Sequence, residues 1–178
     1  MKWLTIFVLM LFVHQDDSNV IFDSTNADSS PKWYVVNDGV MGGLSEGSIK
    51  LNNEGNLEFK GYVTTDNNGG FSSIRSAFDK KDVSQYSYIV LKVKGDGKAY
   101  QFRIKKDYYQ RYTYINSFKT SGEWQLIKLR LADFYPGFRG YQLDRPNYAG
   151  DTMAEIGILI GNKRKESFQL QIEKIYLE

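Results

Sequence analysis

The stretch "AYQFRIK", residues 99–105, decides the fold class. Large apolar side chains alternate in it with polar ones: Tyr100, Phe102 and Ile104 against Gln101, Arg103 and Lys105. A period of two places the apolar set on one face of a β-strand and the polar set on the other. The stretch therefore predicts a half-buried strand of an antiparallel sheet.

The same alternation recurs on both sides of this stretch. It predicts strands within residues 57–63, 89–93, 112–118, 127–131 and 168–172. The run "IGILIG", residues 156–161, is apolar on both faces and predicts a central strand. Since Ile172 and Ile175 fall out of phase, we expect the last strand to bulge at Glu173-Lys174.

The number and character of these strands predict the architecture. No window shows a helical period longer than about two turns. About eight to ten strands, each apolar on one face, predict an all-β fold, an antiparallel β-sandwich of jelly-roll type. The longest stretch without a pattern, residues 132–151, is expected to be an ordered loop packed over one end or face of the sandwich.

Composition excludes several classes of function. The 23 basic and 21 acidic residues balance too closely to predict nucleic acid as a partner. The chain has no cysteine, which removes disulfides, thiolate catalysis and cysteine-based metal sites. Its single histidine, His14, lies in or beside the apolar leader, so a Ser-His-Asp triad is not expected.

The N-terminus predicts a targeting segment. "MKWLTIFVLMLFV" carries one lysine and then an apolar run too short to span a hydrocarbon layer of about 30 Å. We interpret residues 1–15 as a signal peptide and residues 16–178 as one β-sandwich domain. A cleaved leader predicts an exported protein, periplasmic or secreted. An uncleaved leader would tether the protein by its N-terminus, with no other stable membrane insertion.

The glycine-rich stretch "VNDGVMGGLSEG", residues 36–47, matches neither nucleotide-binding fingerprint. We interpret its glycines as backbone positions that need a positive φ or close approach. Asp38 and Met41 remain candidates for a contact surface.

The stretch "NNGGFSSIRSAF", residues 67–78, places Phe71, Ser73 and Arg75 on one strand face. Two interpretations stay open. Arg75 pairs with a carboxylate such as Asp38 and fixes a loop, or its five donors and the nearby aromatic ring bind a sugar or a peptide carboxylate.

The stretch "YYQRYTY", residues 108–114, contains four tyrosines. These side chains form either a stacking surface or part of the core.

No cofactor is predicted, and a structural calcium ion is the one metal left open. Calcium prefers oxygen ligands. The loop oxygens that could serve are those of Asp23, Asn26, Asp28, Asp66 and Asn67, although the spacing of a calcium-binding loop is missing.

Five blocks occur in an order that resembles the complex I intermediate-associated protein 30 family. They are "WYVVNDGVMGGLSEG", "NNGGFSSIR", "GDGKAYQFRI", "DFYPGFRG" and "IGILIGNK…SFQLQI". The resemblance covers residues 20–178. It implies a galactose-binding-like jelly roll, and a role as an assembly factor or chaperone for respiratory complex I without a catalytic centre. The short hydrophobic leader, in place of a basic transit peptide, predicts a bacterial, exported member.

We therefore predict a non-catalytic, accessory binding protein that holds a protein partner. The alternative is a carbohydrate-binding protein outside the cytoplasm that uses Tyr108, Tyr109, Tyr112 and Tyr114 with Arg103 or Arg111. A third hypothesis is a glycan-active enzyme with paired aspartates. A tyrosine-lined groove would favour sugar, and an apolar patch around Met41, Phe138 and Tyr141 a protein. The predicted contact residues are Asp38, Met41, Phe71, Arg75, Tyr100, Arg103, Tyr112, Tyr114, Phe138 and Arg139.

Overall fold

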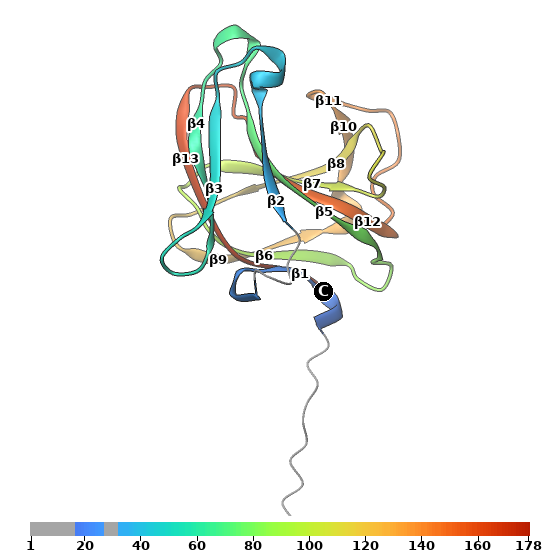
Figure 1. Ribbon diagram of the computed structural model, residues 1–178. Helices are drawn as coiled ribbons and strands as arrows, with labels where there is room; N and C mark the ends of the chain where they lie inside the picture. The colour runs from blue at the N-terminus through green and yellow to red at the C-terminus, as the bar shows by residue number, and fades with distance from the viewer. Residues whose placement is uncertain (1–16, 27–31) are drawn as a thin grey trace, which may run out of the picture.

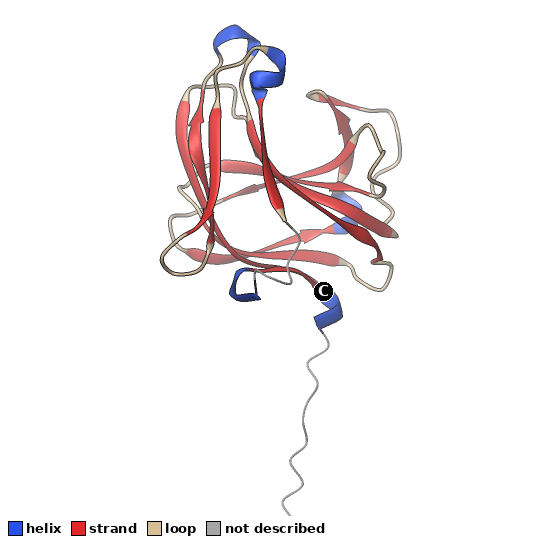
Figure 2. Cartoon of the chain, in the orientation of Figure 1, coloured by secondary structure: helices blue, strands red, loops and turns tan. Residues whose placement is uncertain are grey.

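The computed structural model describes residues 17–26 and 32–178. These residues form two antiparallel sheets packed face to face, as Figures 1 and 2 show. The predicted signal peptide, residues 1–15, lies outside the described residues. The division of the chain at residue 16 stays a prediction.

The first sheet has six strands. Five follow the order β3-β4-β13-β6-β9, and β1 pairs with the C-terminal end of β13. Its strands are β1 (Val20–Asp23), β3 (Glu46–Leu51), β4 (Leu57–Val63), β6 (Tyr88–Lys94), β9 (Trp124–Arg130) and β13 (Glu166–Leu177). The register of β13 against β6 shifts between Ile172 and Lys174. This shift confirms the bulge that the sequence predicts.

The second sheet has seven strands in the order β11-β10-β8-β7-β12-β5-β2. Its strands are β2 (Trp33–Asn37), β5 (Ser72–Asp82), β7 (Ala99–Lys105), β8 (Thr113–Lys119), β10 (Tyr135–Phe138), β11 (Tyr141–Gln142) and β12 (Thr152–Ile160). β12 lies between β5 and β7, so the predicted central strand is confirmed. In Figure 1, β2 and β10–β11 stand at opposite edges of this sheet, apart from each other above its middle strands.

Short 3₁₀ turns are the only helical elements among the described residues. They are η1 (Asp17–Asn19), η2 (Ser24–Asn26), η3 (Asp38–Met41), η4 (Asp66–Asn68) and η5 (Leu131–Asp133).

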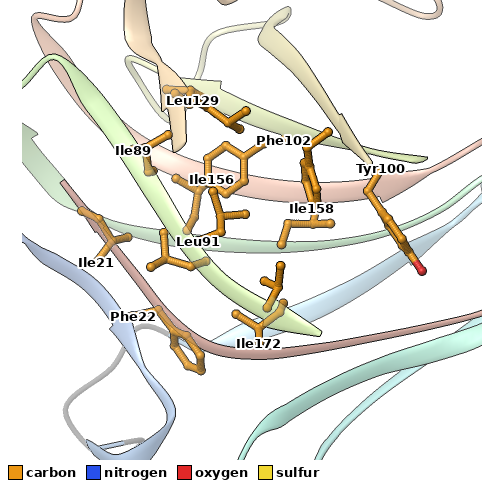
Figure 3. Packing of buried hydrophobic residues seen from close by; sticks show 14 of the residues in the cluster. Ile21, Phe22, Ile89, Leu91, Tyr100, Phe102, Leu129, Ile156, Ile158 and Ile172 are labelled. Carbon is orange, nitrogen blue, oxygen red and sulfur yellow. The ribbon is translucent and has the colours of Figure 1, made fainter. Parts of the chain in front are cut away.

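The core lies between the sheets. Phe102, Ile156 and Ile158 of the seven-stranded sheet face Leu91 and Ile172 of the six-stranded sheet (Figure 3), and all five side chains are almost fully buried. Burial of such apolar surface contributes about 25 cal/mol per Å² and drives the sheets together.

The predicted β-sandwich is confirmed, with two corrections. The described residues hold more strands than the eight to ten expected, since short strands such as β1, β10 and β11 have no alternating pattern. The predicted loop at residues 132–151 contains β10 and β11 and contributes the buried Tyr148. Pro136 and Gly137 inside β10 hid this strand, because both residues are rare in strands.

Candidate functional site

One row of cross-strand neighbours runs over the seven-stranded sheet. The Cα registers pair each member with the next across six adjacent strands, from β2 to β10. We call this set the outer row: Tyr34, Arg75, Gly157, Arg103, Ile115 and Tyr135. Residues directly opposite each other in antiparallel strands share one face of the sheet. The row therefore gathers residues that are up to 123 positions apart in the sequence (157 − 34).

The outer row lies on the face turned away from the core. Its neighbours along the strands, such as Ile74, Phe102 and Ile158, point inward and are fully buried. Successive side chains of a strand alternate between faces. Arg75 and Arg103 therefore lie on the solvent side of the sheet, where both are half-buried.

Gly157 leaves a gap between the two arginines. It pairs with Arg75 on one side and with Arg103 on the other. Neighbouring strands are about 4.8 Å apart, so the two arginine backbones lie about 10 Å apart across the glycine. A small cavity of ≈ 10 Å³ lies at this gap, and its lining includes both arginines, Gly157, Lys105 and Glu155. We call Arg75, Arg103 and the Gly157 gap the arginine site.

Arg103 is held in place by a neutral group. Its Nε–H and one Nη–H donate to Oε1 of Gln101, at 3.2 Å and 2.7 Å. Burial, and after it the positive charge of Arg75, lower the pKa of Arg103 to about 10. The guanidinium is still charged at neutral pH, beside a second cation.

Among the described residues, neither arginine of the arginine site has an ion-pair partner of its own, although Glu155 and its partner Lys105 also line the cavity. Within residues 17–26 and 32–178, neither Arg75 nor Arg103 forms an ion pair. Arg164, in contrast, pairs with Glu166 at 2.8 Å. Two half-buried cations without an anion repel each other, and a bound anion would relieve this repulsion.

Two residues on the same sheet face, Glu155 and Lys105, balance each other's charge. Glu155 and Lys105 lie directly opposite each other on β12 and β7, with 3.1 Å between Oε1 and Nζ. The hydroxyl of Tyr34 donates to Oε2 of Glu155 at 3.5 Å. Burial, followed by the charge of Glu155, raises the pKa of Tyr34. Lys105 thus balances the charge of Glu155, so the cavity that both residues line keeps the net positive charge of Arg75 and Arg103.

The interpretation of Arg75 as an ion-pair partner of Asp38 is wrong. The Asp38 carboxylate accepts four hydrogen bonds, from the backbone N–H groups of Ser45, Gly70 and Phe71 and from the Ser45 hydroxyl. Asp38 is only 1% exposed, which also removes it from a contact surface. Burial raises the pKa of Asp38, but these hydrogen bonds outweigh burial and hold it below its ordinary value.

The glycine-rich stretch is explained by the same carboxylate. A Cβ on Gly43 would lie 2.8 Å from the Cα of Gly69 and would collide with the Asp38 side chain. Gly42 has a φ of 87° at the end of η3. The glycines let the segments after β2 and before β5 close on Asp38, as predicted for backbone positions of close approach. Phe71 takes part through its backbone and is half-buried.

Three predicted aromatic contacts are not at the surface as expected. Tyr100 is 1% exposed and donates its hydroxyl to Asp96 at 3.0 Å, so its role is in the core. Tyr114 is also buried, and its ring packs against Tyr148. Tyr112 is half-buried under the guanidinium of Arg145. Of the two alternatives for the four tyrosines, Tyr114 belongs to the core, whereas only Tyr108 and Tyr109 are strongly exposed.

The remaining predicted contacts lie at the edges of the sheet. Phe138 and Arg139 are at the β10–β11 hairpin, where Arg139 has a φ of 50° and stacks 5.3 Å from the Phe138 ring. Met41 ends η3 next to the opposite edge strand, β2, and its side chain lies outside what the structure describes. The expected patch around Met41, Phe138 and Tyr141 is therefore divided between opposite edges.

Sequence reasoning did not single out Gly157 of the arginine site. Tyr34, Lys105 and Glu155, which lie beside the site on the same sheet face, were not singled out either. Lys105 could have been found from the sequence, because the alternation in residues 101–105 places it on the same strand face as Arg103. The pairing of β12 with both β5 and β7 had no signal in the sequence.

No helix in the described ranges is long and apolar enough to cross a membrane. The same ranges contain no group of three or more His, Cys, Asp or Glu side chains that is arranged to hold a metal ion. Two expected calcium ligands, Asp23 and Asp66, form ion pairs with Lys174 and Lys165. A structural calcium ion stays a prediction.

The fold and the arginine site define a β-sandwich protein with a cationic site on one sheet. The chain belongs to the Complex I intermediate-associated protein 30 (CIA30) family, since that family's model matches residues 22–172. It is 25% identical over 194 residues to "Complex I intermediate-associated protein 30, mitochondrial" of Drosophila melanogaster, covering 95% of this chain and 66% of that protein. Its identity to the Mus musculus protein of the same name is 26%, covering 92% and 57%. The chain thus spans about three fifths of these relatives.

Solved structures with a similar fold include carbohydrate-binding modules. The family 11 module of the cellulase Lic26A-Cel5E from Clostridium thermocellum matches with a TM-score of 0.62 and 16% identity, over 89% of this chain and 93% of the module. The family 11 module in complex with a mixed-linked tetrasaccharide matches with a TM-score of 0.59 and 18% identity, over 89% and 94%. At this identity the likeness shows the jelly-roll fold alone.

The predicted location is corrected by the relatives. The proteins from Drosophila melanogaster, Mus musculus and Caenorhabditis elegans are named as mitochondrial. This finding contradicts an exported, periplasmic or secreted protein. The leader misled the prediction, because a lysine followed by a short apolar run over residues 3–13 was interpreted as a signal for export.

Proposed function

We propose that this protein is a non-catalytic accessory factor in the assembly of respiratory complex I, which holds a protein partner on the outer face of its seven-stranded sheet. The observation that carries the proposal is the arginine site in a member of the CIA30 family. Two half-buried cations on an ordered sheet form a surface that lowers its free energy by binding a partner.

The names of the relatives support complex I as the assembly concerned. Both the Drosophila melanogaster and the Mus musculus proteins are named complex I intermediate-associated. They also support a mitochondrial location for this chain. A carboxy-terminal fluorescent fusion of the full chain tests this location by co-localisation with a mitochondrial marker.

The non-catalytic part of the proposal is supported by what the loop aspartates do. Asp38 organises the glycine-rich segment. Asp96 accepts from the Tyr100 hydroxyl and from the backbone N–H of Gln169. Asp151 pairs with Lys106. Each carboxylate stabilises a loop, which speaks against a pair of aspartates that face each other across a glycosidic bond.

Carbohydrate binding has less support than a protein partner. Tyr112 and Tyr114 pack against other side chains, so they offer no open stacking surface. The cavity at the arginine site has room for about one water molecule, far less than a sugar ring requires.

Deletion of the protein in its own cells tests the proposal. We expect loss of mature complex I and accumulation of subassemblies on native gels, restored by expression of the full chain. Affinity purification of the tagged full chain should enrich complex I subunits over a matched untagged culture. Normal complex I in the deletion strain would refute the assembly role. Retention of the purified chain on a glycan array would favour the carbohydrate hypothesis instead.

A further inference from the structure

We propose that the arginine site binds a carboxylate from an acidic segment of the protein partner. This carboxylate lies between Arg75 and Arg103, above Gly157. This inference rests on the proposed function for the nature of the partner. The ligand group itself follows from the geometry, the donors and the charges of the site.

The geometry places two guanidinium groups around one gap. Arg75 and Arg103 are the cross-strand neighbours of Gly157 on its two sides, and all three lie in the middle strands of the sheet. A Cβ at position 157 would lie 3.1 Å from the backbone oxygen of Ile74, 3.4 Å from Cγ of Arg75 and 4.0 Å from Cβ of Arg103. A side chain there would therefore fill the space between the arginines. Glycine keeps that space open.

The donors of Arg103 are oriented before any ligand arrives. Gln101 accepts two of the five N–H groups of this guanidinium. Three N–H groups remain for a ligand, and the hydrogen bonds to Gln101 fix the plane that presents them. Because Gln101 is neutral, it orients Arg103 without cancelling its charge. Planar guanidinium groups match the two oxygens of a carboxylate.

The charge of the surroundings favours a small anion. Arg75 and Arg103 contribute two positive charges to the cavity, and Lys105 and Glu155, which also line it, compensate each other. The cavity is ≈ 10 Å³, so it has room for about one oxygen atom of a ligand. One oxygen of a carboxylate satisfies both conditions, with the rest of the group above the cavity.

The ends of the outer row suit a peptide on either side of that carboxylate. Tyr34 is 42% exposed, and Tyr135 is half-buried at the other end. Tyrosine supplies a rigid contact surface with a polar tip and is enriched in interfaces between proteins. An acidic residue in the gap would thus have aromatic contacts for its flanking residues.

Arginine-selective NMR on the full chain tests the site. The Nε–H signals of Arg75 and Arg103 are assigned with Arg75→Gln and Arg103→Gln and followed during titration with acetyl-Gly-Glu-Gly-amide. The neutral acetyl-Gly-Gln-Gly-amide is the matched peptide. Arg130→Gln is the matched variant, because Arg130 is an exposed arginine on β9 of the other sheet.

We expect the glutamyl peptide to shift both arginine signals, and the glutaminyl peptide to leave them in place. Each site variant should weaken the apparent affinity at least tenfold, while Arg130→Gln should not change it. Equal shifts with the two peptides would overturn the proposal. So would inorganic phosphate that shifts the signals at lower concentration than the glutamyl peptide, since the site would then be one for free phosphate.

A second measurement separates this inference from the proposed function. The double variant with Arg75→Gln and Arg103→Gln is expressed in the deletion strain, and we expect it to fold but not to restore complex I. Full restoration by the double variant would refute the role of the arginine site and leave the assembly role intact. Peptide binding in vitro, combined with normal complex I in the deletion strain, would refute the assembly role and leave the site intact.

Discussion

The carboxylate of Asp38 accepts a hydrogen bond of 2.7 Å from the backbone N–H of Gly70, which lies 32 residues later in the chain. The contact joins the segment after β2 to the segment before β5. The two strands are neighbours at the edge of the seven-stranded sheet, so the carboxylate fixes the end of this strand pair. Asp38 therefore acts as a structural residue of the glycine-rich segment.

Replacement of this carboxylate should destabilise the protein. Asp38→Ala leaves the N–H groups of Ser45, Gly70 and Phe71 without their acceptor. Because an unsatisfied buried donor is costly, we expect a loss of about 3 kcal/mol in the free energy of unfolding. Chemical denaturation at neutral pH measures it. The exposed Asp144 is the control, and Asp144→Ala should change stability by less than about 0.5 kcal/mol. Equal stability of the two variants would contradict the structural role.

The same carboxylate predicts a dependence of stability on pH. The folded-state pKa of Asp38 lies below the ordinary value of 3.8. A lowered pKa means that the stabilisation is complete above the unfolded-state pKa and is lost as the pH falls through the folded-state pKa. Asp38→Asn carries no such charge, so its deficit relative to the unmodified protein should be largest near neutral pH and shrink below about pH 4. Unfolding curves across this range provide the measurement. A deficit that grows on acidification would refute the assignment.

The close approach at Gly43 predicts that alanine at position 43 destabilises the protein more than alanine at position 39. Gly43→Ala forces a Cβ against the Asp38 side chain and to within 2.8 Å of the Cα of Gly69. Overpacking of this kind costs about 1–3 kcal/mol. Gly39→Ala is the control, because a Cβ there meets nothing within 4 Å, and it should leave stability unchanged or raise it slightly. Thermal unfolding of both variants decides the point, and similar melting temperatures would count against it.

The sequence predicted the faces of the strands well and their neighbours poorly. Tyr100, Phe102 and Ile104 are buried as the alternation required, because a period of two follows from strand geometry alone. β10 and β11 were missed, because four- and two-residue strands are too short for a periodic signal.

The candidate site was only partly accessible from the sequence. Arg75 and Arg103 were both selected, each for its own local pattern. Their convergence on Gly157 depends on the registers of β12 against β5 and β7, which join segments far apart in the chain. Tyr100 was misjudged for a different reason. It was selected as a contact although the alternation itself places it on the core face, opposite Arg103, where the structure buries it.

The arginine site predicts that the half-buried Arg75 does not stabilise the fold. Arg75 makes no ion pair in the part of the chain that the structure describes, and it repels Arg103. Arg75→Gln should therefore keep the melting temperature or raise it, with a gain of about 0.5 kcal/mol at low salt that fades as salt screens the repulsion.

Arg164→Gln is the matched control for this prediction. It removes the charged partner of Glu166, whose side chain is 7% exposed, and should cost about 1 kcal/mol or more. Differential scanning calorimetry of both variants at low and high salt measures the contrast. A lower melting temperature for Arg75→Gln would show that Arg75 anchors the fold, as the ion-pair interpretation held. If Arg75→Gln keeps its melting temperature, the charge of Arg75 is not needed for folding, which agrees with a role in binding.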